Sequence, residues 1–246
     1  MSGAPDLGGI PVAILAGGLG TRLRPAVGDR PKVVAEVAGR PFLAHLLAWL
    51  AAQGFRDVVL CTGHGADAVE TAAARARPEP MRLRASRERE PLGTGGALRR
   101  ALPLLEGDAL LAMNGDSFCD ADLAAAWAWH RARDAEATLV LVEVPDAMRY
   151  GRVEVDDEGR VRRFTEKQAG VGAGWINAGI YLLARSRVAA LPEGVPLSLE
   201  RDVFPAWVGR GLHGYRTRAR FLDIGTPQSY ARASRFFATG RPGADP

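Results

Sequence analysis

Short apolar runs alternate with longer segments of helical periodicity through the first half of the chain. In residues 42–53, Leu43, Leu46, Leu47 and Leu50 fall on one helical face. The predicted strands of this half are residues 12–15, 58–62, 81–85, 109–113 and 137–144, and the predicted helices are residues 42–53, 66–77, 95–105 and 122–134. This alternation predicts an α/β fold with a mixed, mostly parallel doubly wound sheet, which is Rossmann-like.

The second half is richer in predicted strands. Residues 152–155 and 161–165 flank Asp157-Glu158-Gly159, a hairpin turn signal. The other strands expected here are residues 176–183, 212–217 and 220–222. A last helix should begin at Thr226-Pro227, with Thr226 as N-cap, and end before Gly240.

The chain shows neither an internal repeat nor a linker, so residues 1–246 are expected to form one domain. Its two halves are about residues 10–145 and the β-rich residues 146–240. Residues 1–9 and 241–246 have the composition of loose ends.

Composition narrows the class of ligand. The 246 residues carry a net charge of +4, and the arginines are scattered without interleaved aromatics. This pattern favours small anionic substrates over a nucleic-acid face. Cys61 and Cys119 lack metal-site spacing, and free buried thiols indicate a reducing, cytoplasmic environment. No signal peptide or long apolar span is visible, so no membrane partner is expected.

The segment from Ile14 to Lys32, ILAGGLGTRLRPAVGDRPK, carries the first chemical signal. Its glycines follow a predicted strand and can present backbone N–H groups to a ligand, with Arg22, Arg24 and Lys32 close by in sequence. It matches neither the Walker loop nor the dinucleotide fingerprint. The combination favours a polyphosphate, and an unliganded glycine-rich turn is the alternative.

Only two of the thirty-two basic residues are lysines, Lys32 and Lys167. Lysine is a compact point charge, whereas arginine is a bulky planar fork. A narrow phosphate site can require the former, so both lysines are candidate site residues, with chance survival as the alternative.

Two acids follow predicted strands. Asp116 comes after residues 109–113, and Asp223 after Phe221-Leu222. Ligands of open α/β sheets lie at the carboxyl ends of strands, and paired carboxylates there suit Mg²⁺ held partly by substrate phosphates. The alternative is that these are two unrelated acids in turns, which would give the same sequence pattern.

Two further segments carry candidate residues. Glu90 to Gly96 form a second glycine-bearing loop that leads into a helix N-terminus, where either ligand contact or plain capping is expected. Asn177 lies near a strand start and suits hydroxyl recognition, although such an amide is often a turn residue.

The motifs GGLGTRLRP with PK, EPLGTGGAL, NGD, EK, NAGIY and DIGTP occur in the order typical of sugar-1-phosphate nucleotidyltransferases. The chain resembles this family over about residues 11–238. EPLGTGG with NGDSF looks most like its D-glycero-α-D-manno-heptose-1-phosphate guanylyltransferases. The resemblance implies a nucleotide-diphospho-sugar-transferase-like fold, with a nucleotide-binding first half and a sugar-phosphate-binding second half.

The resemblance also implies roles for matching positions. Arg22 would hold the β- and γ-phosphates, Lys32 the α-phosphate, and Asp116 with Asp223 an Mg²⁺ ion. Nucleotide contacts are implied for Leu15, Ala16, Gly17, Gly18, Glu90, Thr94 and Gly95. Sugar-phosphate contacts are implied for Gly151, Glu166, Lys167 and Asn177.

The expected reaction joins an NTP and a sugar 1-phosphate, giving an NDP-sugar and pyrophosphate without a covalent enzyme intermediate. The carboxylate of Glu90 could accept both donors of a guanine edge, so GTP is favoured, with a heptose 1-phosphate as acceptor; alternatively Glu90 caps the helix or faces solvent. The other hypotheses are uridylyl or thymidylyl transfer to N-acetylmuramate, glucose or mannose 1-phosphate, a non-catalytic nucleotide-sensing module, and a glycosyltransferase. Assembly into a homo-oligomer is compatible with the sequence.

Overall fold

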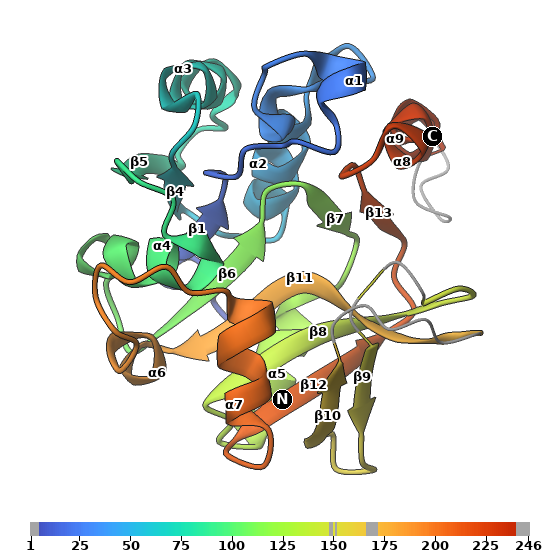
Figure 1. The fold of residues 1–246 in the computed structure, drawn as a ribbon. Helices are drawn as coiled ribbons and strands as arrows, with labels where there is room; N and C mark the ends of the chain where they lie inside the picture. The colour runs from blue at the N-terminus through green and yellow to red at the C-terminus, as the bar shows by residue number, and fades with distance from the viewer. Residues whose placement is uncertain (1–4, 148–149, 151, 166–171, 240–246) are drawn as a thin grey trace.

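A branched sheet of nine strands forms the centre of the part of the chain that the structure describes (Figure 1). This structure is a computed structural model, and it describes residues 5–147, 150, 152–165 and 172–239. The strands of the sheet are β1 Val12–Leu15, β4 Asp57–Thr62, β5 Arg82–Arg87, β6 Ala109–Asn114, β8 Ala137–Val144, β9 Arg152–Val155, β10 Val161–Thr165, β11 Gly174–Ala184 and β12 Leu212–Thr217.

The strand order is β10-β9-β11-β6-β1-β4-β5, with β8 joining β11 to β12. Strands β6, β1, β4 and β5 are parallel, and Ile14 lies between Leu60 and Met113 in register. β11 runs antiparallel to β6, β8 and β9. The predicted mixed sheet is therefore confirmed. Three of its four parallel pairs lie in the first half of the chain, and the fourth joins β12 to β8. Every antiparallel pair of this sheet involves a strand of the second half.

Helices cover both faces of the parallel strands, because alternate strand residues point to opposite faces. Ile14 belongs to the buried layer that also contains residues of α2 (Phe42–Ala52), α3 (Ala66–Ala76) and α5 (Leu123–Ala132). Its neighbour Ala13 belongs to the other layer, which contains residues of α4 (Gly93–Ala101), α6 (Arg185–Ala189) and α7 (Phe204–Trp207). These two buried layers are the cores of a doubly wound sheet.

Two small ribbons lie outside this sheet. β7 (Ser117–Cys119) pairs antiparallel with β13 (Phe221–Asp223), and β2 (Glu36–Val37) pairs with β3 (Arg40–Pro41). The first ribbon joins a segment of the first half of the chain to the C-terminal segment. β13 overlaps the strand expected at residues 220–222, whereas β7 was not predicted.

Several elements differ from the expectation. Leu7 is buried in the core, so residues 5–9 are not a loose end. The helix expected over 95–105 begins earlier, at Gly93, and continues as a 3₁₀ turn at Leu102–Leu104. The last helix is divided into α8 (Pro227–Ala231) and α9 (Ala233–Ala238), with Thr226 and Ser229 forming the predicted cap as a capping box; Gly240 lies outside the described residues.

The remaining helical segments are α1 (Arg24–Val27), the 3₁₀ turn Lys32–Val34 and the π-helical turn Leu199–Val203. Among the described residues, none of the helices combines the length and apolarity that a membrane span requires.

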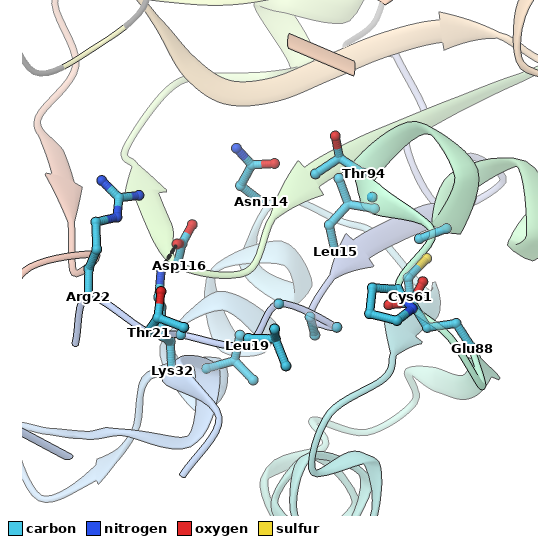
Figure 2. A pocket seen from close by; sticks show the side chains of 18 residues that line it. Leu15, Leu19, Thr21, Arg22, Lys32, Cys61, Glu88, Thr94, Asn114 and Asp116 are labelled. Atoms are coloured by element: carbon cyan, nitrogen blue, oxygen red, sulfur yellow. Dashed lines mark hydrogen bonds and ion pairs between the residues drawn. The ribbon is translucent and has the colours of Figure 1, made fainter. Parts of the chain in front are cut away.

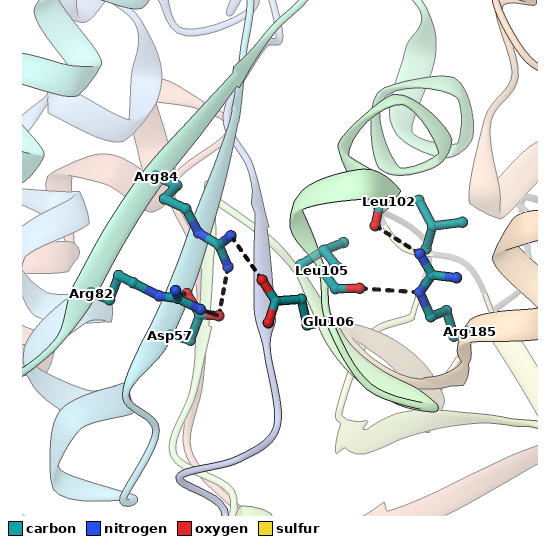
Figure 3. A network of polar contacts seen from close by, with 7 residues as sticks. All are labelled: Asp57, Arg82, Arg84, Leu102, Leu105, Glu106 and Arg185. Carbon is teal, nitrogen blue, oxygen red and sulfur yellow. Dashed lines mark hydrogen bonds and ion pairs between the residues drawn. The ribbon is translucent and has the colours of Figure 1, made fainter.

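Ion pairs tie the edge strand β5 to its neighbour at the amino end of the sheet (Figure 3). Asp57 accepts hydrogen bonds from Arg82 and Arg84, each at 2.6–2.8 Å, and Arg84 also lies 3.7 Å from Glu106. Arginines along an edge strand also discourage pairing with another chain. Arg185 donates to the carbonyl of Leu105 after the 3₁₀ turn. These charges lie at the opposite end of the strands from the candidate site.

Candidate active site

A cavity of about 500 Å³ opens at the carboxyl ends of β1, β4 and β6 and at the start of α4. Figure 2 shows Arg22, Lys32 and Asp116 at one end, Glu88 and Cys61 at the other, and Leu15 between them. The lining residues are Leu15, Ala16, Gly17, Gly18, Leu19, Gly20, Thr21, Arg22, Lys32, Val33, Cys61, Glu88, Pro91, Gly93, Thr94, Ala97, Asn114 and Asp116. A cavity of this size at this edge of an α/β sheet is the expected place for a small ligand.

The glycine loop forms the floor of the cavity. The N–H of Ala16 donates to the carbonyl of Cys61 at 2.8 Å, which anchors the start of the loop to β4. Gly18 is exposed, and a side chain there would meet no protein atom within 4 Å. The predicted nucleotide-binding residues Leu15, Ala16, Gly17 and Gly18 therefore lie together on one wall.

The end of the cavity that could bind phosphates contains cations and one acid. The Nζ atom of Lys32 lies 3.0 Å from Oδ2 of Asp116, and the lysine side chain is only 14% exposed. Arg22 is exposed on the same side. The structure thus brings together all three residues predicted to be catalytic.

Asp223 is brought next to Asp116 by the ribbon of β7 and β13. In register Asp223 pairs with Ser117, and the N–H of Ile224 donates to the carbonyl of Asp116 at 2.9 Å. Oδ1 of Asp223 accepts the N–H of Gly225 at 2.6 Å. Two acids from distant parts of the sequence are thereby close along the backbone, although only Asp116 is among the residues that line the cavity.

Asp116 and Asp223 are the residues that would hold a divalent cation if a substrate supplied further ligands. No group of three or more potential metal-ligating side chains occurs among the residues that the structure describes. Mg²⁺ commonly takes one or two carboxylates and completes its shell with water and phosphate oxygens. Asp116 and Asp223 supply such a set, although they would not form a closed protein cage.

The carboxylate that lines the other end of the cavity is Glu88, which sequence reasoning missed. Its Oε2 accepts the N–H of Leu92 at 3.1 Å. A Cβ at Gly17 or at Gly63 would lie 2.7 Å from its Oε1, so both glycines leave room for this carboxylate. Burial raises the pKa of Glu88, against the weaker effects of the Leu92 N–H and of Arg100.

Glu90, the acid expected in this role, is exposed and does not line the cavity. β5 ends at Arg87, two residues beyond the expected strand end, and Glu88 follows it directly. An acid immediately after the strand was the signal that could have pointed to Glu88. Contact between Glu90 and a nucleotide remains a sequence-based prediction.

The start of α4 lines the cavity through Gly93 and Thr94, but not through Gly95. Gly95 is buried, and its N–H donates to the carbonyl of Leu197 at 2.8 Å. This N–H is therefore already engaged within the protein, and nucleotide contact by Gly95 also remains a prediction.

Asn177 lies on β11, and both the nitrogen and the oxygen of its side-chain amide are hydrogen-bonded. Nδ2 donates to the hydroxyl of Tyr181 at 2.9 Å, and Oδ1 accepts the N–H of Gly179 at 2.9 Å. Gly151, Glu166 and Lys167 lie outside the described residues. Asn177 is therefore the one predicted sugar-phosphate residue whose place the structure describes.

Asn114 and Cys61 are two of the other lining residues that were not predicted. Asn114 ends β6, two residues before Asp116, and Cys61 lies on β4. Burial, assisted by the charge of Glu88, raises the pKa of the Cys61 thiol to about 12. The thiol therefore stays protonated at neutral pH, which makes Cys61 a poor nucleophile.

Comparisons with known proteins show the family of the chain. Residues 12–240 match the family described as nucleotidyl transferase. The chain is 36% identical to a mannose-1-phosphate guanylyltransferase of Mycobacterium tuberculosis, over 94% of this chain and 65% of the relative. It is 35% identical to a mannose-1-phosphate guanyltransferase of Schizosaccharomyces pombe, over 88% of this chain and 61% of the relative. The chain thus spans a little under two thirds of the length of these relatives.

A solved structure is similar over nearly its whole length. HddC from Yersinia pseudotuberculosis, complexed with GMP-PN, superposes with a TM-score of 0.82 at 33% identity. The match covers 93% of this chain and 99% of that one.

Proposed function

Because this chain belongs to the nucleotidyl transferase family, we propose that it transfers a guanylyl group from GTP to a sugar 1-phosphate, releasing pyrophosphate. The observation that carries the proposal is that the two ends of one cavity differ in their charged groups. A carboxylate, Glu88, lies at one end, and the Lys32–Asp116 pair lies at the other.

Base selection is the role proposed for Glu88. A guanine edge presents two donors, N1–H and the N2 amino group, which a carboxylate can accept together. Uracil and thymine present one donor between two acceptors, which suits an amide better than an acid. The Glu88 carboxylate on the cavity wall therefore favours GTP, as the names of the similar guanylyltransferases do.

Phosphate chemistry is the role proposed for the opposite end. An oxygen of the sugar phosphate attacks the α-phosphorus of GTP, and the bond from that phosphorus to the α–β bridging oxygen breaks. Lys32 neutralises the α-phosphate and Arg22 the departing pyrophosphate, so catalysis is positioning and charge stabilisation. Mg²⁺ bound by Asp116 and Asp223 would supply further positive charge to the phosphates.

The acceptor contacts are proposed for Asn177, whose fixed amide can bond a sugar hydroxyl, together with Gly151, Glu166 and Lys167. The resemblance of EPLGTGG and NGDSF favours D-glycero-α-D-manno-heptose 1-phosphate as acceptor. Mannose 1-phosphate is the second candidate, because several similar enzymes are named for it.

Pyrophosphate release, measured with pyrophosphatase and malachite green, tests this function. GTP, ATP, UTP and dTTP are each combined with heptose, mannose, glucose and N-acetylmuramate 1-phosphates. We expect turnover with GTP and the heptose or mannose compound. A tenfold preference for UTP or dTTP, about 1.4 kcal/mol, would overturn the base assignment, and no pyrophosphate from any pair would overturn nucleotidyl transfer.

A further inference from the structure

The glycines of the GTGG segment face another part of the chain. A Cβ at Gly93 would lie 2.6 Å from the carbonyl oxygen of Leu197, and one at Gly96 would lie 2.6 Å from that of Val195. Gly93 also has a φ of +67°, a conformation that favours glycine. The motif is therefore the docking surface of residues 195–197, which approach from the second half of the chain.

Backbone hydrogen bonds fix this contact. The carbonyl of Leu197 accepts the N–H groups of Gly95 and Gly96 at 2.8 and 3.3 Å, and the N–H of Leu197 donates to the carbonyl of Leu92 at 2.8 Å. These are N–H groups that a helix N-terminus would otherwise offer to a ligand. Here they hold the segment that leads to Glu200.

Glu200 receives hydroxyl donors from α4, from β11 and from its own segment. Its Oε2 accepts from Thr94 at 2.8 Å and from Ser198 at 3.1 Å, and its Oε1 accepts from Tyr181 at 3.0 Å. Oγ1 of Thr94 also accepts the N–H of Leu199 at 2.8 Å, so its own hydrogen is directed to Glu200. One carboxylate thus joins α4 of the nucleotide half to β11.

Tyr181 extends this connection to Asn177. Its hydroxyl donates to Glu200 and accepts Nδ2 of Asn177 at 2.9 Å. Burial and the neighbouring charge of Glu200 raise the pKa of Tyr181 well above its ordinary value, so the hydroxyl keeps its proton. Because Oδ1 of Asn177 accepts the N–H of Gly179, the network determines which way the amide faces.

We infer that Glu200 is a positioning residue that couples the two substrate subsites. Through Thr94 it holds the wall of the nucleotide cavity, and through Tyr181 it orients Asn177 toward the acceptor sugar phosphate. The inference rests on the proposed function, because it assigns GTP to the cavity and the sugar phosphate to Asn177.

Steady-state kinetics with GTP and mannose 1-phosphate test this coupling. Glu200→Gln should raise KM for both substrates about tenfold with little change in kcat, because it weakens binding of ground and transition states alike. Tyr181→Phe should raise KM for mannose 1-phosphate alone, and Thr94→Val KM for GTP alone. Thr94→Ser, which keeps the hydroxyl, should restore wild-type values.

Glu193→Gln is the matched control, because Glu193 lies on the same segment with a 77% exposed side chain paired to Arg99. We expect its kinetics to be unchanged. Isothermal titration of each substrate separates the two proposals. If the wild-type enzyme binds both substrates but does not turn them over, the proposed reaction is contradicted and the coupling is not. Unchanged KM and Kd in Glu200→Gln and Tyr181→Phe, even with a lowered Tm, would overturn the coupling.

Discussion

The Nζ atom of Lys32 lies 3.0 Å from Oδ2 of Asp116, although 84 residues separate the two in sequence. The pair stands at the end of the cavity that also holds Arg22. Arriving phosphates would share Lys32 with Asp116, and a cation on Asp116 would free the lysine for the phosphate. Under the proposed function, the two groups of this ion pair would act on the same reacting centre.

Replacing Lys32 by arginine should be damaging although the charge is kept. The lysine stem is closely packed, since a Cβ at Gly20 would lie 3.0 Å from its Cγ, and the planar guanidinium is bulkier than an ammonium. We expect kcat to fall by about 10²-fold, the cost typical of losing one transition-state contact. Arg30→Lys, at an exposed position of the same loop, is the control and should keep wild-type kcat. A Lys32→Arg enzyme within threefold of wild type would mean that the site accepts either cation.

Asp116→Asn and Asp223→Asn should each lower kcat by at least about 100-fold, because asparagine keeps the shape of the acid but loses the charge that binds the cation. EDTA should stop the wild-type enzyme, and added Mg²⁺ should restore it. Circular dichroism should show native folding in both variants. Asp67→Asn, on an 89% exposed acid of α3, should behave as wild type. Undiminished activity in excess EDTA would refute the metal assignment.

Local patterns predicted the strands and the glycine loop because both depend on neighbours in sequence. The buried runs at β1, β4, β6 and β8 were recognisable as strands, and Leu15 to Gly18 follow β1 into the cavity. Asp116 and Asp223 were expected to act together as paired acids at two strand ends. The sequence indicated the strand at residues 220–222 but not β7, the partner strand that brings the two acids together.

What the sequence did not reveal depends on long-range packing. Glu88 faces the cavity because β5 extends to Arg87 and because two glycines leave room for its carboxylate. Gly95 turns away from the cavity because Leu197, from the other half of the chain, takes its N–H. A single sequence offers no register between such distant segments, so Glu90 and Gly95 were natural assignments from the motif alone.

Gly96→Ala should lower the free energy of unfolding by about 1–3 kcal/mol, the usual cost of overpacking a buried position. The added methyl group would lie 2.6 Å from the carbonyl oxygen of Val195 and 2.9 Å from Cβ of Leu92. Gly9→Ala is the control, because a Cβ there meets nothing within 4 Å. Urea unfolding measures both variants, and an unchanged midpoint for Gly96→Ala would show that residues 195–197 can move away at little cost.

The affinity for GTP should fall in mildly acidic solution. Burial raises the pKa of Glu88, so this acid protonates at a higher pH than an ordinary glutamate as the pH is lowered. The protonated form loses an acceptor for the guanine edge, so KM for GTP should rise as the pH falls toward that raised pKa. In Glu88→Gln this rise should be absent, and an identical pH profile in both enzymes would exclude Glu88 as its cause.

Glu88→Gln should also change the choice of base. An amide offers one donor and one acceptor, which complements the N3–H and a carbonyl of uracil, but it faces the guanine edge with a donor against donors. We expect kcat/KM for GTP to fall at least tenfold, about 1.4 kcal/mol, while that for UTP stays constant or rises. Glu90→Gln is the matched control two residues away, where the side chain is exposed, and it should keep the wild-type ratio of GTP to UTP. The reverse result, a changed ratio in Glu90→Gln and an unchanged one in Glu88→Gln, would return base selection to the residue that the motif first suggested.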